Sequence, residues 1–441
     1  FCQGILLKFN KSKILYNKAL NFIAGGVSSN FRLYEPAEVP LFFEKALGSY
    51  MWDVDGNRYI DYVMGLGPNL FGHGPNFIKE AVNKGMSKGF IYSGQHELEI
   101  SVAEQALKFI PMQDSTVRFA SSGTEIVQLA IRLIRSYTGK NKFIKFEGHY
   151  HGWADNVCFS VNPKLDSSGS NMTPIAVPDS SGIDININKN ILICQWNDIE
   201  NINYLFKKYQ GEIGGVIMEP IMGNTNVIMP LPGYLNKVKE LCIRESAILC
   251  YDEIITGFRV AAGGAQEMLN IIPDLATYAK SIAGGFPLAM LVGKREIMNN
   301  IGNGNVVHGG SFNSNLMSIS AAHAVLQRIK QKGPEFYNKL NGLGLHLMNG
   351  LRDVAKKSKI NLKVNGPGSF FSIYFSDKKN ILNWRDHKKN VNDIKYQTFA
   401  KAMLLENIRL SSIGRTHICS THTEEDIEIT IQAAHKVLKN F

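Results

Sequence analysis

A repeated pattern of short apolar runs, glycine-marked turns and amphipathic stretches occupies the chain from about residue 95 to residue 325. Short apolar strands that alternate with helices are typical of a mostly parallel sheet that helices cover on both faces. In such α/β sheets, ligands bind beyond the carboxyl ends of the strands. The pattern predicts strands at Thr116–Ala120, Lys142–Phe146, Gly215–Glu219, Ala247–Tyr251 and Leu288–Gly293, and a helix at Glu125–Tyr137.

The regions on either side of this pattern differ from it. Two β-rich runs around Asp55-Gly56-Asn57 are typical of a hairpin, because Gly and Asn tolerate the positive φ of such turns. The C-terminal part has long helical stretches at Ser318–Gln331 and Glu335–Ser358, then a strand at Ser369–Phe375 and a helix after Thr423.

The length of 441 residues predicts two or three compact units, at roughly 100–200 residues per domain. We expect a large domain over residues 71–325. A smaller α+β domain would follow over residues 326–441, and the N-terminal segment, residues 1–70, would pack with it because chain termini usually lie close together.

The chain carries 48 Lys and Arg against 38 Asp and Glu, a formal charge of +10. The lysines are spread along the chain, and even the basic stretch from Arg385 to Asn390 is short and contains an acid. A nucleic-acid-binding stripe needs clustering on one face, so we expect a solvated surface and no nucleic-acid partner. No apolar run approaches the ~20 residues of a membrane span, so no membrane partner is expected either.

Six cysteines show no CxxC pair and no metal-ligand spacing. This usage indicates buried free thiols in a reducing compartment and predicts a cytoplasmic protein without a metal site. The six are Cys2, Cys158, Cys194, Cys242, Cys250 and Cys419.

A first candidate site is the turn Ser122-Gly123-Thr124, between an expected strand and an expected helix. A helix N-terminus leaves backbone N–H groups unpaired and carries positive dipole charge, so this turn suits a phosphate group. The alternative is an ordinary N-cap, in which the Ser or Thr hydroxyl only terminates the helix.

Two charged residues follow apolar runs in the same region. Asp252 ends the run from Ala247 to Tyr251, and a buried carboxylate there requires either a structural partner or a cationic ligand. Lys280 lies in an apolar run before Gly284-Gly285; a desolvated lysine amine is a nucleophile for carbonyl groups, whereas a surface lysine would be inert.

The stretch from Phe146 to Trp153 contains Tyr150 between His149 and His151. Zinc is disfavoured because no third ligand follows at regular spacing. The remaining interpretations are a stacking platform for a flat ring and a packed aromatic loop. Together, a phosphate cradle, an aromatic face, a buried acid and a lysine amine match the needs of a phosphorylated pyridine aldehyde, in which an acid keeps the ring nitrogen protonated.

These motifs resemble those of the class III (fold type I) pyridoxal-phosphate (PLP) aminotransferases, in the branch similar to glutamate-1-semialdehyde 2,1-aminomutase. The resemblance covers nearly the whole chain, from Gly25–Ser29 through Asp53–Asp61 to His422–Ile427. It implies the fold type I architecture, PLP as cofactor, small-molecule amino donors and acceptors, and a homodimer.

The resemblance also implies roles for single residues. Lys280 would bond to the cofactor aldehyde and carry the proton between substrate and cofactor, Asp252 would pair with the ring nitrogen, and Tyr150 would cover one ring face. The phosphate would be held by Ser122, Gly123 and Thr124. Ile254 would cover the other ring face, and Asn224 would lie near the phenolic oxygen. Ser311 would reach the phosphate bound in the neighbouring subunit.

Substrate binding is expected from Ser29, Arg32 and Arg415. Arg32 matches the position that binds a substrate carboxylate in the aminomutases, and an arginine fork suits that task, although a lone arginine is more often a solvated surface residue.

The chain departs from the aminomutase pattern at two places. Leu66 stands where tryptophan is usual, and Gly414 and Arg415 occupy the stretch where a glutamate is usual. Glu406 lies too far upstream to replace that acid. Arg415 either binds a second carboxylate, as a transaminase with a keto-acid partner requires, or points to solvent.

The sequence therefore predicts a PLP-dependent class III aminotransferase that acts on a carboxylate-bearing amino acid or amine and on a keto acid or aldehyde. The alternative in the same family is glutamate-1-semialdehyde 2,1-aminomutase, which moves the amino group within one molecule and forms 5-aminolevulinate. A non-catalytic binder would have no use for the lysine nucleophile.

Overall fold

The computed structural model describes residues 8–33 and 36–441, and the chain divides into two compact units. The large unit comprises Asn76–Tyr337 and Asn380–Lys389. The small unit combines the chain up to Pro75 with Asn338–Lys379 and Asn390–Phe441.

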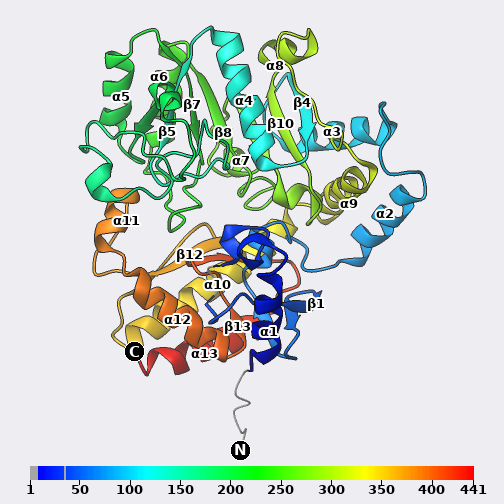
Figure 1. Ribbon diagram of the computed structural model, residues 1–441, viewed down its shortest axis with the longest axis vertical. Coiled ribbons are helices and arrows are strands. Elements are labelled where there is room, and N and C mark those ends of the chain that lie inside the picture. The colour runs from blue at the N-terminus through cyan, green and yellow to red at the C-terminus, as the bar shows by residue number, and fades with distance from the viewer. Residues whose placement is uncertain (1–7, 34–35) are drawn as a thin grey trace, which may run out of the picture. The chain divides into compact units, whose positions relative to one another are not determined.

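The large unit contains a seven-stranded sheet with the order β4-β10-β9-β8-β7-β5-β6 (Figure 1). β10 is antiparallel to both of its neighbours, whereas β9, β8, β7, β5 and β6 pair in parallel. The predicted mostly parallel sheet is thus confirmed. The strands are β4 (Ser115–Ala120), β5 (Lys142–Phe146), β6 (Ile191–Cys194), β7 (Ile213–Met218), β8 (Ile248–Asp252), β9 (Leu275–Tyr278) and β10 (Ala289–Lys294).

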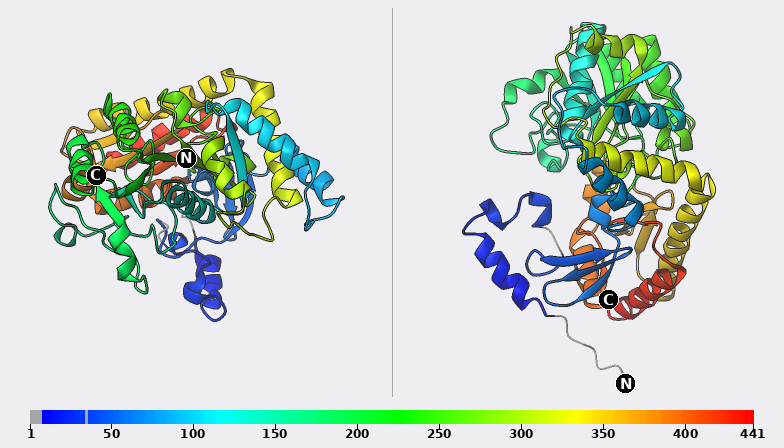
Figure 2. Two further views of the ribbon diagram at one scale, coloured as in Figure 1. Left: turned by 90° about the horizontal axis from the view of Figure 1, so that it is seen from above. Right: turned by 90° about the vertical axis from the view of Figure 1, so that its right-hand side faces the viewer.

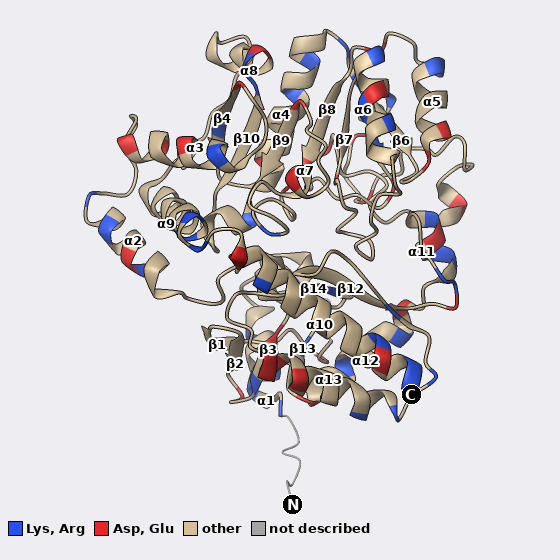
Figure 3. Ribbon diagram, turned by 180° about the vertical axis from the view of Figure 1, so that it is seen from behind, with Lys and Arg blue, Asp and Glu red and all other residues tan. Residues whose placement is uncertain are grey.

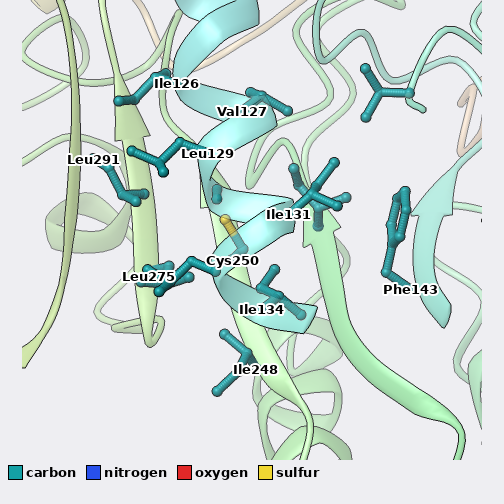
Figure 4. Close-up of a cluster of buried hydrophobic side chains, with 14 of the residues drawn as sticks. Ile126, Val127, Leu129, Ile131, Ile134, Phe143, Ile248, Cys250, Leu275 and Leu291 are labelled. Atoms are coloured by element: carbon teal, nitrogen blue, oxygen red, sulfur yellow. The ribbon is translucent and has the colours of Figure 1, made fainter. Parts of the chain in front are cut away.

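Helices cover this sheet, and one of them shows why the sequence folds in this way. α4 (Gly123–Thr138) directs Ile126, Leu129 and Ile134 toward strand residues such as Cys250 and Leu275 (Figure 4). Apolar residues at helical spacing give α4 one buried face, and burying each such side chain contributes about 1.5–3 kcal/mol. The helix ends at Gly139, which adopts the left-handed conformation that favours glycine.

Three helices form a second group in the large unit. α9 (Leu316–Lys332) packs against α2 (Asn76–Met86) and α3 (Glu97–Phe109) (Figures 1 and 2). A Cβ on Gly85 of α2 would lie 2.3 Å from the hydroxyl of Ser320, so a glycine is needed for this close approach. The other helices of the unit are α5 (Ile199–Lys208), α6 (Tyr234–Arg244), α7 (Ala265–Met268), α8 (Arg295–Gly302) and α11 (Trp384–Asn390), which extends one residue beyond the unit.

The unit boundaries differ from the expected ones, which were residues 70 and 325. All of α9 belongs to the large unit because it packs on α2 and α3, so the change of unit occurs inside α10 (Glu335–Lys357). The stretch 380–389 also belongs to the large unit. There the guanidinium of Arg385 forms a bidentate pair with Glu147, at 2.8 and 2.9 Å.

The expectation of a solvated surface for the basic stretch from Arg385 to Asn390 is wrong for Arg385, which is only 6% exposed. Its charge is compensated by Glu147, and its remaining N–H groups donate to the backbone carbonyls of Ser168 and Gly169 and to Asn171. Composition could not show this, because the partners lie more than 200 residues away in the sequence.

The small unit contains two sheets, of order β1-β2-β3-β13 and β11-β12-β14. The predicted hairpin is confirmed, because β2 and β3 are antiparallel around a turn in which Gly56 has φ +89°. β13 pairs in parallel with β3 and so joins the C-terminal part of the chain to the N-terminal part. The strands are β1 (Phe43–Leu47), β2 (Tyr50–Asp53), β3 (Arg58–Asp61), β11 (Leu362–Asn365), β12 (Phe370–Phe375), β13 (Ile408–Arg409) and β14 (Arg415–His417).

Helices of the small unit are α1 (Asn10–Ala19), most of α10, α12 (Asp393–Leu405) and α13 (Glu424–Leu438). The helix predicted after Thr423 is confirmed, and it begins with a capping box between Thr423 and Asp426.

Charged residues of both signs are mixed along the surface helices, for example on α5, α6 and α13 (Figure 3). Among the described residues, no helix is both long and apolar enough to cross a membrane. The five cysteines of the described chain are free; four are buried and Cys158 is half-buried, whereas Cys2 lies outside the described residues.

Candidate active site

A cavity of about 240 Å³ opens in the large unit. Residues that follow β4, β5, β7 and β9, together with the end of β8, line it, as expected for the carboxyl ends of a mostly parallel sheet. Every residue predicted to bind the cofactor lines this cavity except Ser311. These residues are Ser122, Gly123, Thr124, Tyr150, Asn224, Asp252, Ile254 and Lys280.

The turn Ser122-Gly123-Thr124 begins α4 at one wall of the cavity. The Ser122 hydroxyl accepts a hydrogen bond from the Glu125 N–H at 3.3 Å, so Ser122 is an N-cap, as one of the two interpretations proposed. The turn also faces the cavity, which keeps it available to an anion. A Cβ on Gly123 would lie 2.8 Å from Cδ1 of Ile254, so a side chain at this position would push into the space beside Ile254.

Asp252 is the last residue of β8 and is 4% exposed. Nδ1 of His151 lies 2.7 Å from its Oδ2, and the Ile254 N–H donates to Oδ1 at 3.1 Å. The carboxylate therefore has a structural partner, and it also lines the cavity, where a cationic ligand stays a prediction.

Lys280 follows β9, the strand beside β8, and begins the short 3-10 helix η6 (Lys280–Ala283). The residue is half-buried and lines the cavity, so it is not a solvated surface lysine. Its φ is +49°, a left-handed conformation that costs a residue with a Cβ about 1–2 kcal/mol. Such conformations cluster at functional sites, where the surrounding structure enforces them.

Glu219 holds two of the predicted residues together. Its Oε1 accepts the Tyr150 N–H at 2.7 Å and the Asn224 side-chain N–H at 2.8 Å, and its Oε2 accepts the Asn224 backbone N–H at 3.0 Å. Burial raises the pKa of the Glu219 carboxyl, and burial likewise raises the pKa of the Tyr150 hydroxyl. One buried acid thus holds both the backbone of Tyr150 and the side-chain amide of Asn224 at the cavity wall.

These residues fit pyridoxal phosphate. A Cβ on Gly152, which has φ +103°, would lie 2.7 Å from the Thr124 hydroxyl, so the chain can approach the turn closely only with glycine there. One space of suitable size is surrounded by a buried carboxylate, a lysine, an aromatic ring and a helix N-terminus. The apolar part of the lining includes Ile221 and Ile255, and Trp153 lies at the rim with 75% of its surface exposed.

The predicted substrate residues belong to the small unit. Arg32 is exposed and Ser29 half-buried at the short 3-10 helix η2 (Asn30–Arg32). Arg415 is only 6% exposed in β14, so it does not point to solvent.

Gly414 explains part of the departure from the aminomutase pattern. It has φ +80°, and a Cβ there would lie 2.2 Å from the backbone oxygen of Ile373. A glutamate therefore does not fit at this position. Glu406, the nearby acid, forms a surface ion pair with Lys436 at 2.7 Å.

Ser311 lies in an exposed segment outside the cavity. It lines a different hollow of the large unit, together with residues 90–96 and with Arg118 and His308. Arg118 donates to Nδ1 of His308 at 3.1 Å.

Comparison with known proteins agrees with this geometry. The model of the family "Aminotransferase class-III" matches residues 33–423. The chain belongs to the class III aminotransferases.

Class III proteins similar to this chain include enzymes of both predicted types. A glutamate-1-semialdehyde 2,1-aminomutase of Methanosphaera stadtmanae is 37% identical over 97% of this chain and 98% of its own length. The structure of an omega-transaminase from Sphaerobacter thermophilus superposes with a TM-score of 0.88, at 26% identity over 97% of both chains. A β-phenylalanine aminotransferase from Variovorax paradoxus has a TM-score of 0.85, at 26% identity over 97% of this chain and 93% of that one.

Membership of this family confirms the predicted fold type I architecture, the cofactor and the enzyme class: the protein is a PLP-dependent aminotransferase or aminomutase. Its substrates are small molecules.

Sequence reasoning missed two residues of the site, His151 and Glu219. His151 lies in the aromatic stretch that the sequence singled out, but its partner Asp252 is 101 residues away. Glu219 follows an apolar strand in the same way as Asp252, and this position was the available signal.

Proposed function

We propose that this class III enzyme is a transaminase, which passes an amino group between a carboxylate-bearing amino acid or amine and a keto acid or aldehyde. The observation that carries the proposal is the convergence of Lys280, Asp252 and the Ser122–Thr124 turn on one cavity. The same residues serve the aminomutase, so the preference for a transaminase depends on Arg415 and Gly414.

Each residue of the cavity has a task in this proposal. The N–H groups and hydroxyls of Ser122, Gly123 and Thr124 hold the phosphate, because a helix N-terminus favours an anion. Tyr150 and Ile254 would cover the two ring faces, Asn224 would lie near the phenolic oxygen, and Asp252 would hold a proton at the ring nitrogen. When bound, PLP supplies an aldehyde and an electron-withdrawing ring.

Lys280 acts as the nucleophile and as the proton carrier. With PLP bound, its Nζ would be the group that accepts and returns protons at the cavity, which is general acid–base chemistry. The Asp252 carboxylate stays buried, so its charge acts in surroundings of low dielectric and is effective over a short distance.

Ser29, Arg32 and Arg415 are the proposed ligands of substrate carboxylates. Arg415 is buried in β14, and an arginine fork suits a carboxylate because it can bind both oxygens. Two arginines would suit a transaminase with a dicarboxylate partner.

The second candidate is glutamate-1-semialdehyde 2,1-aminomutase. The relative from Methanosphaera stadtmanae, which is 37% identical over nearly the full length, favours it. The absence of room for a glutamate at position 414 speaks against it.

A homodimer is part of the proposal, with Ser311 reaching the phosphate of the neighbouring subunit. Large apolar side chains lie exposed near Ser311, which is typical of an interaction surface. They are Phe90 (57% exposed), Val307 (73%) and Phe312 (65%). The cytoplasmic location stays a prediction.

The test is the visible absorption spectrum of the holoenzyme with single amino donors and no keto acid. A transaminase bleaches the violet band of the bound cofactor and releases one equivalent of the matching keto acid. Conversion of glutamate-1-semialdehyde without any external donor would instead establish the aminomutase. No cofactor band after addition of PLP would refute both.

A further inference from the structure

A short strap, residues Asn380–Lys389, belongs to the large unit although the chain before and after it belongs to the small unit. α11 begins within the strap, and its first two residues, Trp384 and Arg385, are buried. His387 lies one turn further along α11 and stacks on the Trp384 ring, with the ring centroids 5.2 Å apart at an interplanar angle of 26°. This contact sets the orientation of the His387 ring.

Through His387 the strap contacts the turn that contains Asn226. Nδ2 of Asn226 lies 2.8 Å from Nδ1 of His387, and the amide N–H donates to the ring nitrogen. A second connection runs through Asn197, whose side-chain N–H groups donate to the backbone oxygens of Met229 and Leu382, at 3.1 and 3.0 Å. The strap is therefore joined to this part of the chain at two points.

The turn around Asn226 has a strained backbone. Asn226 and Val227 both have φ +47°, in the left-handed region, which a β-branched residue rarely adopts. Such conformations persist only where the surrounding structure enforces them. Both residues are buried, and the Thr225 hydroxyl beside them donates to the Gly148 carbonyl at 3.1 Å. The contact between Asn226 and His387 is thus one of the interactions that hold a strained turn in place.

This turn carries a residue of the candidate active site. Asn224 lines the cavity and lies two residues before Asn226. Met222 and Ile228 pair across the turn, with N–H to oxygen distances of 3.1 and 3.2 Å, so the segment between them moves as one piece. Glu219 accepts hydrogen bonds from the backbone and from the side chain of Asn224. A shift of the turn at Asn226 would therefore move Asn224 relative to Glu219 and to the cavity.

We infer that His387 is a positioning residue of the cofactor site, which holds Asn226 and thereby keeps the Asn224 amide in place at the cavity wall. His387 itself is not among the residues that line the cavity, and it lies 161 residues from Asn226 in the sequence. The inference rests on the proposed function, in which Asn224 would lie near the phenolic oxygen of PLP.

The first experiment compares the visible spectra of two holoenzyme variants, His387→Ala and His387→Asn. The asparagine oxygen can accept the Asn226 N–H near the position of Nδ1. A hydrogen-bond donor beside the phenolic oxygen withdraws electron density from the conjugated system, so displacement of Asn224 makes that system easier to protonate.

The effect expected of His387→Ala is that of about one lost hydrogen bond. The pH midpoint of the visible cofactor band should rise by about half a unit to one unit, and PLP binding should weaken about three- to tenfold. His387→Asn should restore most of both effects. A purely structural role for His387 would lower the Tm without moving the midpoint.

The second experiment measures amide hydrogen exchange of the holoenzyme at the Ile228 N–H, which closes the turn. His387→Ala should speed this exchange about three- to tenfold, because local opening of the turn becomes easier. Asn226→Gly removes the same contact, and glycine adopts the positive φ of this position without strain. In the Asn226→Gly background, His387→Ala should therefore change neither the midpoint nor the exchange any further.

Lys388→Met is the matched control. Nζ of Lys388 lies 4.8 Å from the centroid of the Trp384 ring, on the same helix as His387. The variant removes this contact of α11 and leaves the pair of Asn226 and His387 intact. It should leave PLP affinity, the pH midpoint and the exchange rate unchanged.

The outcomes separate this inference from the proposed function. Wild-type protein that forms no cofactor band refutes the proposed site itself. A normal wild-type band with an unchanged midpoint in His387→Ala refutes only the inference, and so does a Lys388→Met variant that behaves like His387→Ala. If His387→Ala does not fold, Asn226→Gly tests the same contact, and an unchanged midpoint in that variant overturns the inference.

Discussion

The buried ion pair of Arg385 and Glu147 makes a quantitative prediction about stability. Arg385→Ala removes two hydrogen bonds to Glu147 and those to the carbonyl oxygens of Ser168 and Gly169. It leaves the Glu147 carboxylate, which is 1% exposed in its side chain, without its cation. Breaking such a pair from one side costs about 3–5 kcal/mol.

Thermal unfolding of the holoenzyme at pH 7, followed by circular dichroism, measures this loss. For a unit of this size, each kcal/mol of lost stability lowers the Tm by about 2–4 °C, so we expect a Tm lower by roughly 10 °C. The matched control is Arg295→Ala. Arg295 pairs with Asp114 at 2.7 Å, but both side chains are more than half exposed, so we expect about 1 kcal/mol or less.

The stability lost in Arg385→Ala is expected to depend on pH. Burial raises the pKa of Glu147, and Arg385 opposes that rise. Without Arg385, the pKa of Glu147 in the folded state lies further above its unfolded value. The stabilising protonated form is then present at acidic pH and lost as pH rises, so the deficit of Arg385→Ala shrinks from pH 8 to pH 5. Equal losses for Arg385→Ala and Arg295→Ala, or a deficit that grows on acidification, would refute the reasoning.

Three further predictions concern the site. Lys280→Ala should lower turnover by about a hundredfold to ten-thousandfold with unchanged Tm, and near wild-type turnover would contradict its role as nucleophile and proton carrier. Arg415→Ala should raise KM for dicarboxylate partners by about tenfold or more and leave KM for simple amines unchanged; equal effects on both classes would remove the argument for a transaminase. Glu253 has a folded-state pKa of about 7 against 4.5 for the unfolded chain, so its contribution to stability is present below about pH 4.5 and lost as pH rises through 7. Between pH 4.5 and 7, Glu253→Gln should remove about 3 kcal/mol of the change with pH in the free energy of unfolding, measured by urea unfolding. An unchanged pH profile would show that Glu253 does not titrate there.

Much of the large unit could be predicted from local patterns. The strand at Lys142–Phe146 was placed to the residue, and the helix after Ser122 was located to within two residues at each end. These elements have unambiguous apolar periodicity and clear end signals, namely a Ser at the N-cap and a Gly at the end. Several strands of at most four residues were missed, because so short a run shows no clear periodicity; they are β6, β9, β11, β13 and β14.

The candidate site was predicted for a different reason. Ser122, Asp252 and Lys280 each follow or end an apolar run, and polar groups at such places are costly without a partner or ligand. The residue type alone indicates what chemistry each of them can perform. The partners that orient them were not predictable, since His151 and Glu219 have several equally plausible roles in a linear sequence.

The sequence by itself determined the alternation of strands and helices, the residue types at the strand ends and the family. Tertiary structure decided which of these residues meet. Strand order places β8 between β7 and β9. The assembled fold brings His151 to Asp252 across 101 residues, and it brings Arg385 of α11 to Glu147 across 238. Local propensities act over a few residues, whereas such pairings depend on how the whole sheet is assembled, so no local pattern records them.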